Sequence, residues 1–338
     1  MNNFEYSRAT DVADAIRQIA ADPAAKFIAG GTNLVDLMKY DVARPARLID
    51  ITQLPLKSLE ETPDGGVRIG ALVPNSDLAY HPLIADRYPL LASAILAGAS
   101  QQLRNMASTA GNLLQRTRCF YFYDTATPCN KREPGSGCAA IKGINRINAI
   151  LGTSDACIAT HPSDMCVALA ALDARVHVTG PAGARSIAFA DFHRLPEHSP
   201  HIDTTLEPDE IVTAIELPSK GFAKNYSYLK IRDRASYAFA LVSVAAALEI
   251  DSGRIREARV ALGGVAHKPW RRIDAEAALR GEAPDRTVFA KAADILLKGA
   301  RGYSHNAFKI GLGRRAILRT LTQAANATPQ IQSVKKIR

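Results

Sequence analysis

The sequence lacks any apolar run long enough to cross a bilayer. Its most apolar stretch, residues 238–248, is well short of the roughly 18–20 residues that a membrane helix needs. The first residues have neither the basic nor the apolar segment of a secretion signal. We therefore expect no membrane span and no signal peptide on this chain.

Motifs for nucleic-acid binding are also missing, as are internal repeats and low-complexity tracts. Lys and Arg number 42 against 33 Asp and Glu, a net charge of +9, but basic and acidic residues interleave over most of the length. We interpret the excess as solvated surface and expect no nucleic-acid partner. The 338 residues, of which 47% are hydrophobic and 22% charged, are typical of a soluble globular protein with about two domains.

Standard catalytic and nucleotide motifs are absent. The sequence contains neither the Rossmann G-x-G-x-x-G nor the Walker G-x-x-x-x-G-K pattern. It contains no G-x-S-x-G, and its histidines show no H-E-x-x-H pairing, so they are predicted to be surface or core residues. The histidines concerned are His161, His177, His193, His198 and His201.

Hydrophobic periodicity and turn signals predict alternating helices and strands. The amino-terminal half is predicted to contain strands at 25–28, 47–51 and 67–72 and helices at 11–21 (capped by Thr10), 33–40 and 90–97. Next come a strand at 156–160, a helix at 164–172, a hairpin at 176–188 and a strand at 211–217. Beyond a break at 218–224 follow strands at 226–232, 237–250 and 255–262, then helices at 288–297 and 306–321.

A segment poor in periodicity, from residue 115 to about 152, interrupts this pattern. It is rich in proline and glycine and holds three of the five cysteines. Because so long a stretch without regular structure is unusual inside a compact domain, we predict that it is functional.

The five cysteines all lie between positions 119 and 166, and disulfides are an unexpected use for them without a secretion signal. The pattern has no C-x2-C pair, which weakens a zinc site, whereas a four-thiolate iron–sulfur cluster tolerates long spacings on a loop. Residues 116–146 also carry six basic and two acidic residues, a charge that favours a reduced cluster. An iron–sulfur cluster, a zinc site and unligated thiols all remain open on the residues alone. Cys166 lies in an apolar helical run and is predicted to be a buried structural thiol, leaving Cys119, Cys129, Cys138 and Cys157 as the candidate ligands.

Two glycine turns stand where a phosphate could bind. Residues 29–33 follow a predicted strand and open a helix, and residues 108–112 have similar character. Backbone N–H groups at such turns can hold a phosphate, and a third junction, 162–164, offers the carboxylate of Asp164. Two such turns without a standard fingerprint favour another dinucleotide cradle, such as one for FAD.

These residues carry a family resemblance. The segments 27–34 (FIAGGTNL), 103–113 (LRNMASTAGNL) and 161–164 (HPSD) resemble the FAD-binding subunit of the molybdenum hydroxylases, the xanthine dehydrogenase and carbon monoxide dehydrogenase medium-subunit family. Segment 228–238 is similar to the carboxyl-terminal motif of that family, and the resemblance extends to about Leu321. The cysteine segment resembles the subgroup with an additional [4Fe–4S] cluster, which includes bacterial periplasmic aldehyde oxidoreductases. Asn33 and Ala110 stand where many relatives have Asp and Gly; both departures leave the phosphate-facing backbone intact.

The resemblance implies an α+β fold with a two-subdomain FAD-binding domain of the vanillyl-alcohol-oxidase type. The subdomains would be residues 1–58 and 59–218, with an iron–sulfur loop at 115–157. A carbon monoxide dehydrogenase flavoprotein-like α+β domain would follow at 219–324, then a flexible tail at 325–338.

For the site, the resemblance implies FAD and a [4Fe–4S] cluster on this chain, the latter ligated by the four cysteines named above. The first turn would contact FAD, chiefly its pyrophosphate, through Lys26, Phe27, Ile28, Ala29, Gly30, Gly31, Thr32, Asn33 and Leu34. The second turn would add Thr109, Gly111 and Asn112. Asp164 would bond a ribose hydroxyl and Lys230 would reach the isoalloxazine edge.

The implied role is electron transfer within a heterotrimer, with no substrate chemistry on this chain. A small subunit with [2Fe–2S] clusters and a large subunit with the molybdenum cofactor would oxidise an aldehyde, in particular an aromatic one, to a carboxylic acid. Electrons would pass to FAD here and on to an external acceptor. The expected location is the periplasm, reached by co-export with a signal-bearing partner, or else the cytoplasm. The alternatives are a zinc-stapled scaffold subunit and a self-contained flavin oxidase.

Overall fold

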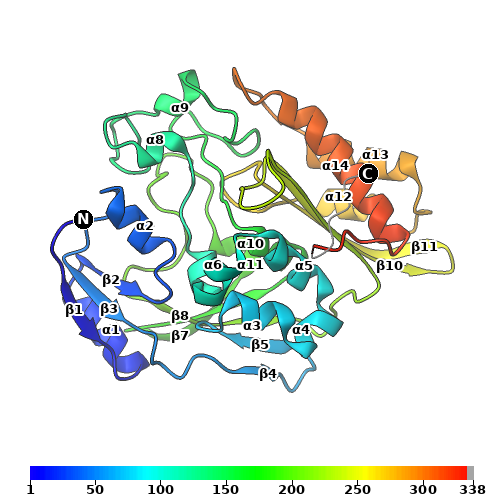
Figure 1. Ribbon diagram of the computed structural model, residues 1–338. Helices are drawn as coiled ribbons and strands as arrows, with labels where there is room; N and C mark the ends of the chain where they lie inside the picture. Colours follow the sequence, from blue (N-terminus) through cyan, green and yellow to red (C-terminus); the bar gives the residue numbers. More distant parts are fainter. Residues whose placement is uncertain (333–338) are drawn as a thin grey trace.

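The computed structural model describes residues 1–332 and contains three β-sheets with helices packed between and around them (Figure 1). The tail predicted at 325–338 begins at the last residue of the final helix, and its residues 333–338 lie outside the described part. Over residues 1–332, no helix has both the length and the apolar character that a membrane crossing requires.

The amino-terminal sheet is three-stranded and parallel, in the order β1-β3-β2. It comprises β1 (Glu5–Arg8), β2 (Ala25–Ile28) and β3 (Arg47–Asp50), with helices α1 (Val12–Ala21) and α2 (Leu34–Lys39) as its connections. The unit strand, glycine turn, helix, strand predicted for residues 25–51 is confirmed. The predicted cap of α1 is wrong by one residue, because Asp11 rather than Thr10 accepts a hydrogen bond from the N–H of Asp14, at 2.7 Å.

The middle sheet has five strands in the order β4-β5-β8-β6-β7, all antiparallel. Its strands are β4 (Leu59–Glu61), β5 (Val67–Gly70), β6 (Arg175–Gly180), β7 (Gly183–Ala188) and β8 (Ile211–Leu217). The helices of this region are α3 (Asn75–Tyr80), α4 (Pro82–Arg87), α5 (Pro89–Ala97), α6 (Gln101–Met106), α7 (Thr109–Leu113), α10 (Asp164–Ala171) and α11 (Phe189–Phe192).

The carboxyl-terminal sheet is antiparallel in the order β12-β11-β10-β9. It comprises β9 (Asn225–Ile231), β10 (Val242–Asp251), β11 (Arg254–Gly263) and β12 (Trp270–Arg271), with helices α12 (Ile273–Ala277), α13 (Arg286–Leu296) and α14 (Phe308–Ala325). The strand predicted at 237–250 begins only at Val242, because the preceding residues form a loop beside a cavity.

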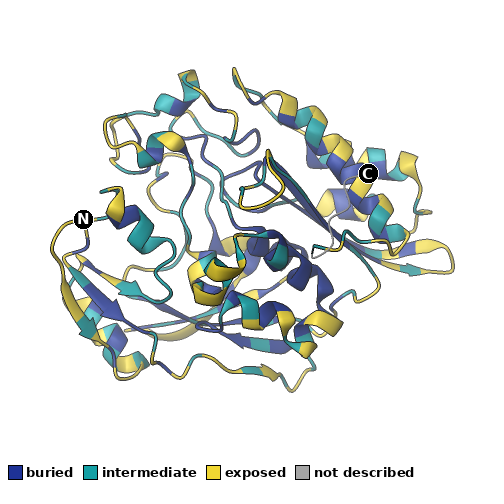
Figure 2. Cartoon of the chain, in the orientation of Figure 1, coloured by how far each residue is buried: buried dark blue, intermediate teal, exposed yellow. Residues whose placement is uncertain are grey.

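Helices α5 and α10 join the middle and carboxyl-terminal sheets. All eight residues of α10 are buried, as expected for a helix that is apolar on every side (Figure 2). Residues 165–171 of this helix belong to one hydrophobic core that extends from the middle sheet to Tyr228 and Ala245 of the carboxyl-terminal sheet, whose other face packs on α13 and α14. The main core therefore runs across the two parts of the chain.

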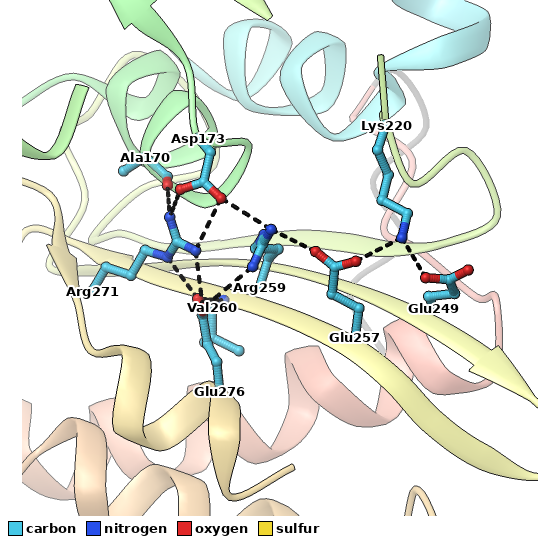
Figure 3. A network of polar contacts seen from close by, with 9 residues as sticks. All are labelled: Ala170, Asp173, Lys220, Glu249, Glu257, Arg259, Val260, Arg271 and Glu276. Atoms are coloured by element: carbon cyan, nitrogen blue, oxygen red, sulfur yellow. Dashed lines mark hydrogen bonds and ion pairs between the residues drawn. The ribbon is translucent and has the colours of Figure 1, made fainter. Parts of the chain in front are cut away.

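A polar network reinforces the same junction at the end of α10 (Figure 3). Arg271 donates to the carbonyl of Ala170 at 2.8 Å and pairs with Asp173 and Glu276. Arg259 also pairs with Asp173, at 3.0 Å. Since Asp173 follows α10 and both arginines lie on the carboxyl-terminal sheet, the network fixes that helix to the sheet.

The segment predicted to be aperiodic, residues 115–152, crosses the top of the molecule as drawn in Figure 1, near α2 and α14. It contains only two short helices, α8 (Phe120–Tyr123) and α9 (Ala139–Lys142). The strand predicted at 156–160 is not formed. The carbonyl of Ile158 accepts from Ala149, and the N–H of Ala159 faces the sulfur of Cys157, so these groups enter no strand ladder.

Candidate functional site

The first glycine turn presents unpaired backbone donors between β2 and α2. Among residues 1–332, the N–H groups of residues 30–33 have no hydrogen-bond acceptor. Gly31 adopts a φ of +69°, which favours glycine. A Cβ on Gly30 would lie 1.8 Å from the carbonyl oxygen of Met106. Gly30 is thus required because the backbone before the second turn passes directly against it.

The second turn is organised differently. Ser108 caps α7 by accepting from the N–H of Gly111, at 3.2 Å. The hydroxyl and the N–H of Thr109 both donate to the carbonyl of Val73, at 2.8 and 3.0 Å. The side chain of Asn112 bonds Asn75 and accepts from Ser163. This turn therefore offers a ligand the small size of Gly111 rather than a row of free N–H groups, and both ends of the Asn112 amide are already bonded within the protein.

Two cavities meet at these turns. The larger has a volume of about 1200 Å³ and the smaller about 420 Å³, against roughly 300–1,000 Å³ for typical ligand sites. Both are lined by Thr32, Asn33, Gly111, Gln115 and His161. The remaining predicted residues of the first turn line the smaller cavity only: Lys26, Phe27, Ile28, Ala29, Gly30, Gly31 and Leu34.

The other predicted cofactor residues differ in whether they line a cavity. Asn112, Asp164 and Lys230 line the larger cavity. Thr109 lines neither and is 1% exposed, so its side chain faces the protein interior. The two turns and the Asp164 junction, far apart in sequence, thus line two cavities that share part of their walls.

Unpaired buried donors line the larger cavity. The Oδ1 of Asn33 accepts from the N–H of Arg116 at 3.0 Å, while its Nδ2 is buried without a partner in the described chain. The Nε atoms of Arg104 and Arg118 are also buried and unpaired there. Buried donors normally find acceptors, so this wall fits a ligand rich in acceptor oxygens. A dinucleotide with its pyrophosphate has that chemistry, and the residues present therefore fit FAD.

Asp164 and Lys230 form a buried ion pair across the domain junction. The Lys230 ammonium donates to Asp164 Oδ2 at 2.7 Å and to the carbonyl of Ala97 at 3.2 Å. The Tyr228 hydroxyl donates to Asp164 Oδ1 at 2.7 Å, and burial followed by the charge of Asp164 raises the pKa of Tyr228. Each Asp164 oxygen already accepts one bond, so the roles predicted for the two residues toward the ribose and the isoalloxazine stay predictions.

Two histidines that showed no pairing in the sequence lie side by side. The rings of His161 and His193 are 4.3 Å apart, and each Nε2 donates to the carbonyl of Leu113, at 3.3 and 2.9 Å. Burial lowers the pKa of both, that of His193 to about 4, so the rings are neutral near pH 7. With Cys166 they form the one group of three potential metal ligands within 4.8 Å that we find in residues 1–332. Cys166 lines neither cavity and is 0% exposed, which confirms it as a buried core thiol.

The other four cysteines gather in a separate small core with Phe122. Cys129 and Cys138 face each other in an isolated antiparallel bridge. In zinc sites, bonds of about 2.3 Å hold neighbouring sulfurs only about 3.8 Å apart. The described residues contain no group of three cysteine sulfurs within 4.8 Å of one another. Burial raises the pKa of Cys119 and Cys138, and that of Cys157 to about 12, so these three side chains would be protonated as free thiols.

A charged cluster joins the cysteine loop to the first turn. The buried ammonium of Lys131 pairs with Asp203, whose other oxygen accepts from Arg116 at 2.8 Å. The N–H of Arg116 in turn bonds Asn33 of the first turn. The charge of Lys131 lowers the pKa of Cys157 against the effect of burial. Sequence reasoning missed Asp203, because a single acidic residue in a distant loop carries no local signal.

Comparison with known proteins identifies two family domains in the chain. Residues 2–220 match a family model described as the FAD binding domain in molybdopterin dehydrogenase, and residues 227–324 match the CO dehydrogenase flavoprotein C-terminal domain. The chain is 52% identical to the aldehyde oxidoreductase FAD-binding subunit PaoB of Escherichia coli K12, over 96% of this chain and 99% of that protein. It is 27% identical to the glyceraldehyde dehydrogenase medium chain of Sulfolobus acidocaldarius, over 81% and 79%.

A solved structure supports the fold. The carbon monoxide dehydrogenase from Hydrogenophaga pseudoflava has a chain that superposes with a TM-score of 0.76 at 24% identity, covering 96% of this chain and 98% of that chain. The fold and site thus define an FAD-binding oxidoreductase subunit with two kinds of domain. The chain belongs to the FAD-binding medium subunits of the molybdenum hydroxylase family.

Proposed function

We propose that this chain is the electron-transfer subunit of a molybdenum-dependent aldehyde oxidoreductase and carries a [4Fe–4S] cluster besides FAD. The observation behind the proposal is the convergence of Cys119, Cys129, Cys138 and Cys157 on one buried core that is tied to the first glycine turn. The similarity to an aldehyde oxidoreductase subunit over nearly the whole chain supports the aldehyde as substrate class, and we propose aromatic aldehydes in particular.

FAD would occupy the two cavities. The free N–H groups of residues 30–33 and the unpaired Nδ2 of Asn33 would bind the pyrophosphate, near Gly111, which lines both cavities. Lys230, with two of its three ammonium hydrogens already used, keeps one donor for a ligand in the larger cavity. Bound FAD supplies a centre that accepts and releases electrons singly or in pairs, and the protein's part is to hold it and set its surroundings.

The four cysteines suit an iron–sulfur cluster better than zinc. In the described chain no three of their sulfurs lie within 4.8 Å of one another, whereas a tetrahedral zinc site holds its sulfurs closer. Burial raises the pKa of Cys119, Cys138 and Cys157, so a metal centre would have to stabilise these thiolates. Lys131 and Arg116 both pair with Asp203, so two positive charges face one negative charge beside the loop. The net positive charge favours a reduced, more negative cluster. The cluster would supply a one-electron relay between the partner subunits and FAD.

The proposed assembly is a heterotrimer. A small subunit would hold [2Fe–2S] clusters and a large subunit the molybdenum cofactor, where the aldehyde would be oxidised. FAD on this chain would pass electrons to an external acceptor. We propose a periplasmic location through co-export with a signal-bearing partner, with the cytoplasm as the alternative.

The test is the iron and acid-labile sulfide content of the purified complex, with the partner's [2Fe–2S] contribution subtracted. We expect about four irons and four sulfides on this chain. Cys157→Ser should lose them, because serine is a poor, harder ligand. The matched control Cys166→Ala should keep them. Zinc in place of iron, or iron loss only in Cys166→Ala, would overturn the proposal.

A further inference from the structure

One buried side chain donates a hydrogen bond to a cysteine sulfur of the proposed cluster. The amide Nδ2 of Asn148 lies 3.4 Å from Sγ of Cys119, within hydrogen-bond range for sulfur. Asn148 is 2% exposed and Cys119 7%. The bond is therefore shielded from water, where electrostatic effects are strong.

The Asn148 amide makes no other side-chain bond in the described chain. Its Oδ1 is buried without a partner. Burying an amide without satisfying both of its ends costs free energy, so this residue is a poor choice for stability alone. Its neighbour Asn145, also buried, instead bonds Ala140, Ser304 and His305. The arrangement at Asn148 is thus directed at the sulfur.

The carboxyl-terminal domain holds the backbone of Asn148 in place. Its carbonyl accepts from the ammonium of Lys309 at 2.8 Å and from the amide of Asn306 at 3.2 Å. Lys309 is fully buried and also donates to the carbonyl of Gly264, at 2.6 Å. Lys309 lies in the first turn of α14 and Asn306 just before that helix, so contacts from outside the cysteine loop hold the backbone of Asn148.

We propose that Asn148 is a positioning residue that donates an N–H···S hydrogen bond to the Cys119 thiolate and thereby raises the reduction potential of the [4Fe–4S] cluster. The inference rests on the proposed function, since it requires the cluster. Reduction adds negative charge to the cluster and its sulfur ligands, and an aligned N–H dipole stabilises that charge more in the reduced state than in the oxidised state. The cluster with this hydrogen bond would therefore accept an electron at a higher potential than the same cluster without it.

The experiment is a redox titration of the purified complex, following the EPR signal that Cys157→Ser removes. Asn148→Leu replaces the amide by an apolar group of similar size. We expect about a tenfold fall in the ratio of reduced to oxidised cluster at the wild-type midpoint, equal to roughly 59 mV for one electron. The matched control is Asn145→Leu, a change of the same kind in the same segment that removes no bond to sulfur, and its midpoint should stay at the wild-type value.

Each outcome decides the matter. An unchanged midpoint in Asn148→Leu with full iron, or equal shifts in both variants, overturns the inference. If Asn148→Leu loses its iron, its redox titration is replaced by a second measurement. We would then record pulsed EPR spectra of the reduced wild-type complex that carries asparagine labelled with 15N in the side chain. A weak 15N coupling is then expected, and its absence overturns the inference. A wild-type complex without iron on this chain overturns the proposed function, and the inference with it.

Discussion

Replacing Lys230 by methionine should destabilise the junction between the two domains. The ammonium of Lys230 lies 2.7 Å from Asp164, and the two side chains are only 3% and 7% exposed. Removing one partner of a buried ion pair leaves the other charge without compensation, at a cost of about 3–5 kcal/mol. In Lys230→Met, the hydroxyl of Tyr228 would be the one side-chain partner left to Asp164 among residues 1–332.

The double variant Asp164→Asn/Lys230→Met separates charge from packing. It removes both charges and keeps an acceptor for Tyr228, so we expect a loss of about 1–2 kcal/mol, typical of missing hydrogen bonds. The assay is urea unfolding of the purified chain, followed by the fluorescence of Trp270, the only tryptophan, on the same sheet as Lys230. Exposed Lys298→Met is the control and should change the free energy of unfolding by less than about 0.5 kcal/mol. A double variant as unstable as Lys230→Met would refute the reasoning.

Three further predictions follow from the site. Gly30→Ala should lose both flavin and thermal stability, because the added Cβ would collide with the backbone of Met106. Gly111→Ala should lose flavin but keep the fold, because its Cβ would meet only the hydroxyl of Ser108, at 2.8 Å. Equal melting temperatures of the two variants would contradict this expectation. Cys166→Ala should cost about 1–2 kcal/mol in urea unfolding, as for a small core truncation, and a cost near zero would mean that its site is not packed. The lowered pKa of His193, about 4, means that the unfolded state binds more protons between pH 6.5 and 4. Stability should therefore fall as the pH drops through that window, by on the order of 3 kcal/mol from this residue, and the fall should be shallower in His193→Gln; identical pH profiles would contradict the assignment.

Regular elements with a clear apolar pattern were predictable from the sequence. The hairpin of β6 and β7, the strand β8 and the helix α10 fall where periodicity and turn residues place them, because burial on a sheet or helix face repeats along the chain. The apolar stretch 156–160 failed the same reasoning. Ile158 and Ala159 are buried, but their backbone groups bond individual residues such as Ala149 and not a neighbouring strand. Hydrophobicity alone does not distinguish a buried loop from a buried strand.

The site was predictable in its residue types and only partly in its geometry. Glycine turns and cysteines carry local signals, so they could be singled out. The reason for Gly30, contact with the backbone of Met106, depends on a segment far along the chain. The pairing of His161 with His193 and the bond from Asn148 to Cys119 likewise depend on tertiary packing, for which a single sequence offers no spacing rule.

The way the cysteine loop is anchored has a consequence for the order of folding. Hydrogen bonds anchor this loop to distant parts of the chain. Arg116 bonds Asn33 across 83 positions, Lys131 bonds Asp203 across 72, and Asn148 bonds Asn306 across 158. Contacts at such separations close large loops and form after local structure. A chain still emerging from the ribosome, without α14, would lack the bonds from Asn306 and Lys309 that hold the backbone of Asn148. We therefore expect the part of the cysteine loop around Asn148 to reach its final position only after the carboxyl-terminal helix has been synthesised and has packed.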